Sequence, residues 1–260
     1  MLSKLAAVQM AVTDGDGEAN RRRALELMDA AKGADLYLLP ELWTSGYSLD
    51  LWPSAAKDDT PHALAWMSEQ ARLRHAFVGG SVIARNDDGT LANRLLLFNR
   101  DGSEVMRYDK CHLFPPMQEP SRLAAGSSAP IVDIEGTRVA PAICYDLRFP
   151  EMFRRAALGS VDLFLVPSEW PHPRQRALSV LAESRAIENQ AYLLLSNRCG
   201  RDSGETRFCG NSGFFGPFGA IATAGDEEAV VTAEIDRALL DRARRALRVF
   251  DERRQGIDFD

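Results

Sequence analysis

The chain has 260 residues, of which 45% are hydrophobic and 26% charged, as in an ordinary globular protein. We expect a single domain over residues 1–260, because no Ser-, Gly- or Pro-rich linker divides the sequence. The formal net charge of -6 argues against a nucleic acid or an anionic membrane as a partner, since both bind basic surfaces.

The start of the chain and its cysteines exclude further classes. Residues 1–17 turn polar too early for a signal peptide, and no apolar run approaches the roughly 18 residues of a membrane span, so a cytoplasmic location is expected. The four cysteines form no CxxC pair and have no run of histidines beside them. We therefore expect free thiols, no bound metal and no cofactor.

Helical segments and apolar, β-rich runs alternate along the chain, which predicts an α/β fold. Helices are expected at about 18–32, 64–75 and 174–189. Another is expected from Pro150 to Gly159, because proline suits the first turn of a helix and glycine its end. The predicted strands are 5–12, 35–40, 76–84, 94–99, 129–134, 138–143, 161–167, 191–197 and 229–235.

Two of these runs are similar to each other. DLYLLP at 35–40 and DLFLVP at 162–167 share Asp, Leu, Leu and Pro in register, which predicts two similar halves in a pseudo-twofold sandwich unless the match is chance. Both are apolar at consecutive positions, so both faces of these strands should be covered. Turn signals at 87–89, 101–102 and 225–226 predict antiparallel hairpins.

Three reactive side chains follow the ends of predicted strands, where a rigid scaffold displays active-site groups: Glu41, Lys110 and Cys144. Each also has an ordinary explanation, as a surface turn, a solvated cation and a small buried side chain. Cys144 is the strongest candidate, because a strand leads into it and a helix opens at Pro150, as in a nucleophile elbow. The G-x-S-x-G motif of serine hydrolases is absent, and no histidine offers an obvious triad partner.

The segments around these residues resemble the nitrilase, or carbon-nitrogen hydrolase, superfamily. They are LLPELWTSGY around Glu41, YDKCHLF around Lys110 and PAICYDLRFPE around Cys144, in that order. The resemblance implies an α/β fold of four layers, an α-β-β-α sandwich. It also implies that Cys144 is the nucleophile and Glu41 the proton carrier, while Lys110 and the backbone N–H of Tyr145 stabilise the oxyanion.

Members of the superfamily carry a second glutamate after the lysine, and Glu119 fits that position. Its implied role is to orient Lys110 or Glu41 through hydrogen bonds. A position in a surface loop is the alternative, because prolines make residues 114–120 irregular.

The segments CYDLRFPE, PSEWPHPR and RAIENQAY are most similar to the branch that contains ω-amidases, which deaminate 2-oxo acid amides such as 2-oxoglutaramate, and deaminated-glutathione amidases. This similarity implies a small amide substrate that bears a carboxylate. Trp170 is expected to wall the pocket, and Arg174 either binds the substrate carboxylate or is solvated on its helix. Tyr47 is expected near the pocket mouth, and Arg148 with Glu151 as an ion pair at the elbow.

Other readings remain open. Within the same fold, the substrate could be an N-carbamoyl amine or a nitrile. In a different class, the chain would be a catalytically silent scaffold whose Cys144 is structural or redox-sensing. The resemblance further implies a homodimer across the helical face, or a larger homo-oligomer.

Overall fold

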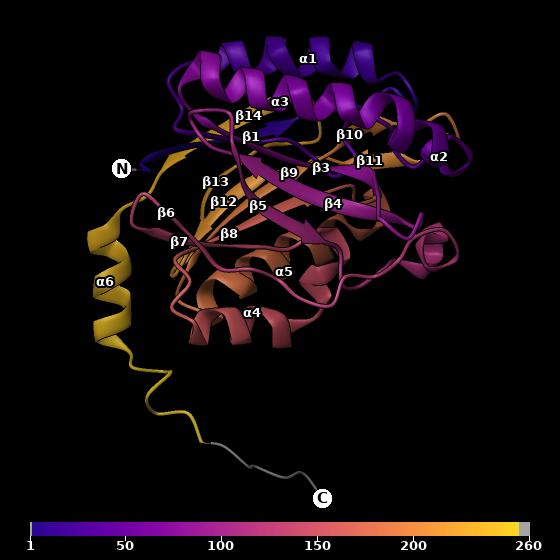
Figure 1. Ribbon diagram of the computed structural model, residues 1–260. Coiled ribbons are helices and arrows are strands. Elements are labelled where there is room, and N and C mark those ends of the chain that lie inside the picture. Colours follow the sequence, from indigo (N-terminus) through magenta and orange to yellow (C-terminus); the bar gives the residue numbers. More distant parts are fainter. Residues whose placement is uncertain (1, 255–260) are drawn as a thin grey trace, which may run out of the picture.

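The computed structural model describes residues 2–254 and contains two six-stranded sheets stacked between outer helices (Figure 1). The first sheet has the strand order β14-β1-β2-β3-β4-β5. Helices α1 and α3 cover its outer face (Figure 1). The strands are β1 Lys4–Gln9, β2 Leu36–Leu38, β3 Phe77–Arg85, β4 Leu91–Phe98, β5 Glu104–Asp109 and β14 Ala229–Glu234.

The second sheet has the order β13-β12-β9-β8-β7-β6, and helices α4 and α5 cover its outer face (Figure 1). Its strands are β6 Val132–Ile134, β7 Thr137–Pro141, β8 Leu163–Ser168, β9 Tyr192–Asn197, β12 Gly213–Gly216 and β13 Gly219–Thr223. Strands β10 Cys199–Arg201 and β11 Arg207–Cys209 form a separate two-stranded sheet. The helices are α1 Gly17–Ala30, α2 Trp52–Ser54, α3 Thr60–Arg74, α4 Pro150–Leu158, α5 Gln175–Glu188 and α6 Arg237–Ala246.

Both faces of the central strands are buried, as the consecutive apolar residues predicted. In β1, Leu5 and Ala7 pack into the core between the sheets, while Ala6 and Val8 pack toward the helices. Successive side chains of a strand point to opposite faces, so a run without polar residues fits a strand that is covered on both sides. The predicted α-β-β-α sandwich is therefore confirmed.

The two sheets repeat one topology. In the first, β14 pairs antiparallel with β1, β1 to β3 are parallel, and β4 and β5 follow antiparallel. In the second, β6 pairs antiparallel with β7, β7 to β9 are parallel, and β12 and β13 follow antiparallel. The similar runs at 35–40 and 162–167 are the equivalent middle strands β2 and β8, so the expectation of two similar halves is confirmed.

Local predictions were right to different degrees. The turns at 87–89 and 101–102 join antiparallel strands, and α4 starts at Pro150 as expected. The expected hairpin at 225–226 was wrong, because β13 and β14 belong to different sheets and this turn crosses between them.

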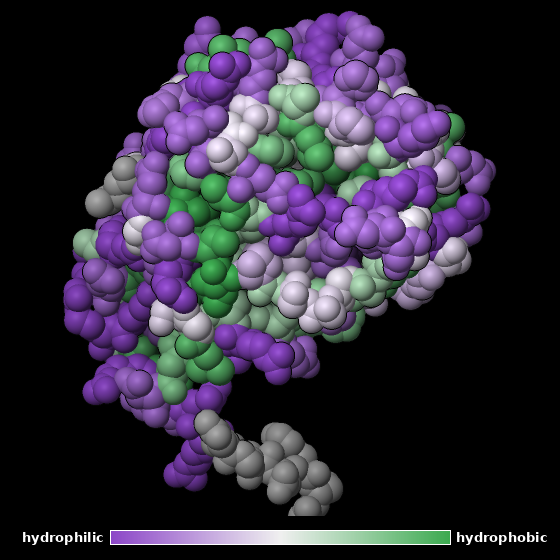
Figure 2. Space-filling view, in the orientation of Figure 1, coloured by the Kyte–Doolittle hydropathy of each residue, from purple (hydrophilic) through white to green (hydrophobic). Residues whose placement is uncertain are grey.

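Polar side chains cover most of one face of the molecule, and an apolar patch lies over β6 and β7 (Figure 2).

Candidate active site

Lys110 lies at the centre of a buried charge cluster where β5 ends. Its Nζ is 2.8 Å from Glu41 Oε1 and 2.9 Å from Glu119 Oε1, and none of the three side chains is exposed to solvent. An ammonium group has three N–H donors, so two of them are used by the carboxylates and one is left for another acceptor.

Glu41 follows β2, and four groups hold its carboxylate in place. Oε1 accepts hydrogen bonds from Tyr47 Oη at 3.1 Å and Asn93 Nδ2 at 2.7 Å, in addition to Lys110. Oε2 accepts from the backbone N–H of Glu169 at 2.9 Å. These donors come from both sheets of the sandwich, so the orientation of Glu41 is fixed by the packing of the two halves.

Glu119 lies at the start of a short 3-10 helix and is fully buried, although the surrounding loop is rich in proline. Its Oε1 accepts a hydrogen bond from Tyr47 Oη at 2.8 Å as well as from Lys110, and its Oε2 accepts one from Phe114 N at 2.6 Å. The structure thus brings Glu119 to Lys110 and Glu41, and the surface-loop alternative is wrong.

The charges in the cluster act on one another. Burial alone would lower the pKa of Lys110, but the carboxylates of Glu41 and Glu119 outweigh it and hold that pKa above its usual value. Burial, followed by the same two carboxylates, holds the pKa of Tyr47 well above its usual value. Lys110 is therefore a cation and Tyr47 a neutral hydrogen-bond donor at neutral pH.

Cys144 begins a tight 3-10 turn, Cys144–Arg148, three residues after the end of β7. Its φ of 50° lies in the left-handed region, which is strained for a residue with a side chain. The buried carboxylate of Asp146 stabilises this turn, because its Oδ2 accepts from Ile143 N at 2.8 Å and Tyr108 Oη at 2.6 Å. Its Oδ1 lies 2.7 Å from His112 Nδ1, which adds a further contact from the segment after β5.

The thiol of Cys144 is buried beside the charge cluster. Burial, and then the negative charge of Glu41, hold the pKa of this thiol well above its usual value, while Lys110 acts in the opposite direction. Cys144 therefore carries its proton at rest, and a neighbouring base has to accept that proton before the sulfur can attack.

A small pocket opens in front of Cys144, with an empty volume of about 230 Å³. The guanidinium of Arg148 lies over the Trp170 ring, 5.1 Å from its centroid, and that of Arg174 lies over the Phe114 ring at 5.4 Å. The pocket is lined by Phe114, Cys144, Tyr145, Arg148, Glu169, Trp170, Pro171 and Arg174.

Comparisons with known proteins agree with this geometry. The model of the carbon-nitrogen hydrolase family matches residues 4–245. The chain belongs to the carbon-nitrogen hydrolase family. It is 32% identical to the 2-oxoglutaramate amidase of Bacillus subtilis, over 97% of this chain and 98% of that protein. It is 37% identical to the omega-amidase YafV of Escherichia coli K12, over 91% of each.

Among solved structures, the protein XC1258 of Xanthomonas campestris is similar throughout. It is a CN-hydrolase superfamily protein with an arsenic adduct in its active site, and it matches with a TM-score of 0.92 and 32% identity over 100% of both chains. The predicted superfamily and the predicted enzyme class, a carbon-nitrogen hydrolase, are therefore confirmed.

In this carbon-nitrogen hydrolase, Tyr145, Trp170 and Arg174 line the pocket beside Cys144, as the sequence suggested. Tyr47 is not among the residues that line this pocket, and its hydroxyl lies between Glu41 and Glu119 inside the cluster. The expected Arg148–Glu151 ion pair does not occur within residues 2–254, where the guanidinium of Arg148 lies over the Trp170 ring instead.

Three site residues of this hydrolase were missed: Asn93, Asp146 and Glu169. A weak signal was available for each. Asn93 interrupts the apolar run of β4, and Asp146 lies two residues after the candidate nucleophile. Glu169 lies just past β8, one position beyond the residue that matches Glu41 in the two similar runs, so the internal similarity pointed to this region.

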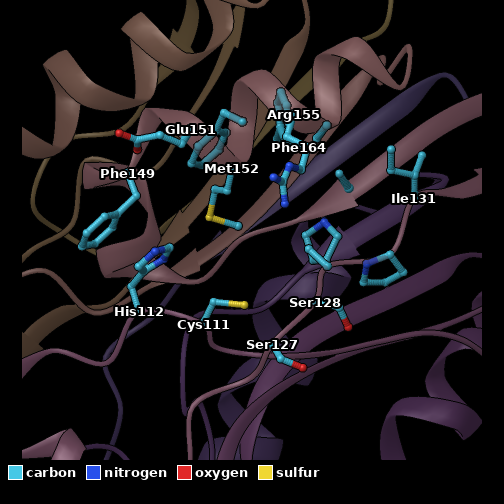
Figure 3. Close-up of a pocket in the computed structure, with 16 residues that line it drawn as sticks. Cys111, His112, Ser127, Ser128, Ile131, Phe149, Glu151, Met152, Arg155 and Phe164 are labelled. Atoms are coloured by element: carbon cyan, nitrogen blue, oxygen red, sulfur yellow. The ribbon is translucent and has the colours of Figure 1, made fainter.

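A larger pocket of the hydrolase lies on the other side of the elbow and contains none of Glu41, Lys110 and Cys144. Figure 3 shows Cys111 and His112 at its wall, with the ring of His112 stacked on Phe149. Within residues 2–254, no group of three or more His, Cys, Asp or Glu side chains is arranged to hold a metal ion. The same residues contain no helix with the length and apolar character of a membrane span.

Proposed function

We propose that this carbon-nitrogen hydrolase cleaves the amide of a small substrate bearing a carboxylate, such as 2-oxoglutaramate, to the acid and ammonia, with Cys144 as its nucleophile. The observation that carries the proposal is the placement of a protonated thiol beside a carboxylate, Glu41, and a lysine with one free N–H. Amide hydrolysis needs these three groups: a nucleophile, a proton carrier and an oxyanion stabiliser.

In the first half of the reaction, Glu41 accepts the thiol proton as Cys144 Sγ bonds to the amide carbon. The oxygen of the tetrahedral intermediate accepts hydrogen bonds from the free N–H of Lys110 and the backbone N–H of Tyr145. Glu41 then passes its proton to the amide nitrogen, the C–N bond breaks, and ammonia leaves. The product of this half is a thioester on Cys144.

In the second half, water replaces ammonia. Glu41 accepts a proton from the water while the water oxygen bonds to the thioester carbon. The N–H groups of Lys110 and Tyr145 stabilise the second oxyanion. The C–S bond then breaks, and the proton on Glu41 returns to the sulfur of Cys144. Glu119 and Tyr47 hold Glu41 and Lys110 in place throughout.

The pocket supports a small acidic acyl group. Arg174, and Arg148 beside it, supply guanidinium groups that suit a carboxylate. Relatives named 2-oxoglutaramate amidase and omega-amidase support the same substrate class.

Ammonia release from a panel of substrates tests the proposal: 2-oxoglutaramate, deaminated glutathione, N-carbamoylputrescine and a simple nitrile. We expect turnover of 2-oxoglutaramate, and none in Cys144→Ala. Intact mass should show an acyl adduct on the wild type during turnover and no adduct on Cys144→Ala. Turnover of N-carbamoylputrescine alone would overturn the substrate class, and the absence of both ammonia and an adduct would favour a silent scaffold.

The remaining expectations concern assembly and location. We propose a homodimer formed through the outer helical layer, because Leu158 on α4 and Val180 and Ile187 on α5 are 46%, 47% and 43% exposed. Sedimentation velocity of the wild type and of Val180→Glu tests this, with a shift to monomer expected for the variant. The cytoplasmic location remains a prediction that cell fractionation tests.

A further inference from the structure

Glu169 is a fully buried carboxylate that has only half of its hydrogen-bonding capacity filled. Its Oε2 is 3.2 Å from Arg198 Nη1. Its Oε1 has no hydrogen-bond partner among residues 2–254, although the side chain is only 1% exposed. Leaving a buried polar atom unpaired costs stability, so a group in this state calls for an explanation.

The position of Glu169 supplies one. The residue lines the pocket in front of Cys144, and its backbone N–H donates to Glu41. The next residue, Trp170, lines the same pocket, and its Nε1 also lacks a partner in the described part of the chain. Two adjacent residues of the pocket wall therefore carry buried polar atoms that have no partner among residues 2–254.

We propose that Glu169 is a substrate-binding residue whose Oε1 donates a hydrogen bond to an acceptor oxygen on the acyl chain, beyond the scissile amide. This inference rests on the proposed function, because it places the acyl group in the pocket beside Cys144. The Glu169 donor selects substrates with a keto or carboxylate oxygen at that position over acyl chains made only of hydrocarbon.

The surroundings of Glu169 make its carboxyl group a donor near neutral pH. Burial raises the pKa of Glu169 to about 8, with Arg198 lowering it and Glu41 raising it. Nη1 of Arg198 donates a hydrogen bond to Oε2, so the proton of the neutral acid belongs on Oε1. The charged or titratable groups around Glu169 are Arg198, Asp14, Glu41, Tyr47 and Cys144, with Tyr145, Arg148 and Arg174 in the same pocket.

Two substitutions separate binding from support of the fold. In Glu169→Gln, the carbonyl oxygen can still accept from Arg198, and the amide N–H2 remains a donor to the pocket at every pH. In Glu169→Leu, the donor is lost, while Arg198 keeps Asp14 and two backbone carbonyls as partners. Glu228→Gln is a matched control, because Glu228 also pairs with an arginine, Arg23, away from the pocket.

The first readout is selectivity among three five-carbon amides: 2-oxoglutaramate, glutaramate without the keto group, and pentanamide without either acid oxygen. Glu169→Leu should lower kcat/KM for 2-oxoglutaramate about tenfold, the worth of one hydrogen bond, and leave pentanamide within about threefold. A loss for 2-oxoglutaramate alone assigns the keto oxygen, and an equal loss for glutaramate assigns the carboxylate. An equal loss for all three amides, or no loss, overturns the proposal.

The second readout is the pH dependence of kcat/KM. It does not need Glu169→Leu, so it tests the proposal even if that variant does not fold. The donor exists below the pKa of about 8 and is lost above it, so wild-type kcat/KM for 2-oxoglutaramate should fall as pH rises through about 8. This decline should disappear in Glu169→Gln and persist in Glu228→Gln. A decline that persists in Glu169→Gln overturns the proposal, whereas a wild type that releases no ammonia from any amide overturns the proposed function itself.

Discussion

Two buried charge clusters lie side by side in this hydrolase, and each has one cation between two carboxylates. The first is Lys110 with Glu41 and Glu119, and the second is Arg198 with Glu169 and Asp14. They touch where the backbone N–H of Glu169 donates to Glu41. They lie at similar places in the fold, because Glu41 lies just past β2 and Glu169 just past the equivalent strand β8, one position beyond the residue that matches Glu41.

The two cations differ in how their N–H donors are used. Lys110 uses two N–H groups on its carboxylates and keeps the third beside Cys144. Arg198 spends its terminal N–H groups on Glu169, Asp14 and backbone carbonyls, and its planar group lies over the Phe208 ring at 4.3 Å from the centroid. A small cation with a spare donor suits an oxyanion, whereas a guanidinium whose terminal nitrogens donate to several acceptors suits the support of neighbouring segments. The two clusters therefore divide chemistry from positioning.

The largest expected effect separates the two cations by the same substitution. Lys110→Met should lower kcat about 10²- to 10³-fold, the usual loss on removing an oxyanion donor. Arg198→Met should leave kcat within about tenfold of the wild type at low temperature. Each variant leaves two carboxylates without their buried partner, so each should lose about 3–5 kcal/mol of unfolding free energy.

Steady-state ammonia release at 10 °C and urea unfolding measure the two quantities independently. Lys32→Met, at an exposed position, controls for the introduced methionine and should change neither. Similar losses of kcat in Lys110→Met and Arg198→Met at equal folded fraction would contradict the division of roles.

A smaller effect is expected at the support of the elbow. Asp146→Asn keeps the size of the side chain but replaces one acceptor oxygen by an N–H2 group, so Ile143 N, Tyr108 Oη or His112 loses its partner. A shift of the strained Cys144 should lower kcat about 10- to 100-fold with little change in KM. The rate of Cys144 alkylation by iodoacetamide reports the same shift without substrate.

Asp133→Asn is the matched control for this prediction, because Asp133 is exposed. Within residues 2–254, its carboxylate accepts a hydrogen bond only from Gly136 N, in the turn between β6 and β7. A wild-type kcat in Asp146→Asn would show that the turn holds Cys144 without this carboxylate.

How much of this could be predicted from sequence depended on whether the signal was local. The central strands were identified because both of their faces are buried, which makes their sequences apolar without interruption. Strand β5, Glu104–Asp109, was missed because it is an edge strand whose exposed residues alternate with buried ones. Its short run of six residues contains three charged residues, Glu104, Arg107 and Asp109.

The site followed the same rule. Glu41, Lys110, Glu119 and Cys144 were found from local segments that resemble one superfamily. The contact of the Tyr47 hydroxyl with Glu119, 72 residues further along the chain, was not predicted, because no local pattern encodes such a contact. Glu169 was missed for a related reason: its free oxygen becomes visible only when the partner of the other oxygen, Arg198, is placed beside it.

The smallest expected effect extends the comparison to cations at the surface of the pocket. Arg174 is only half buried, lies over the Phe114 ring and donates no side-chain hydrogen bond within residues 2–254, unlike Arg198, whose terminal nitrogens have several acceptors. Arg174→Leu should raise KM for 2-oxoglutaramate about tenfold with kcat nearly unchanged, because a charge-assisted hydrogen bond is lost. KM for pentanamide, which has no carboxylate, should not change.

Arg176→Leu replaces an exposed arginine on the same helix and is the control. An unchanged KM in Arg174→Leu, with a raised KM in Arg148→Leu, would move the carboxylate site to the arginine stacked on Trp170.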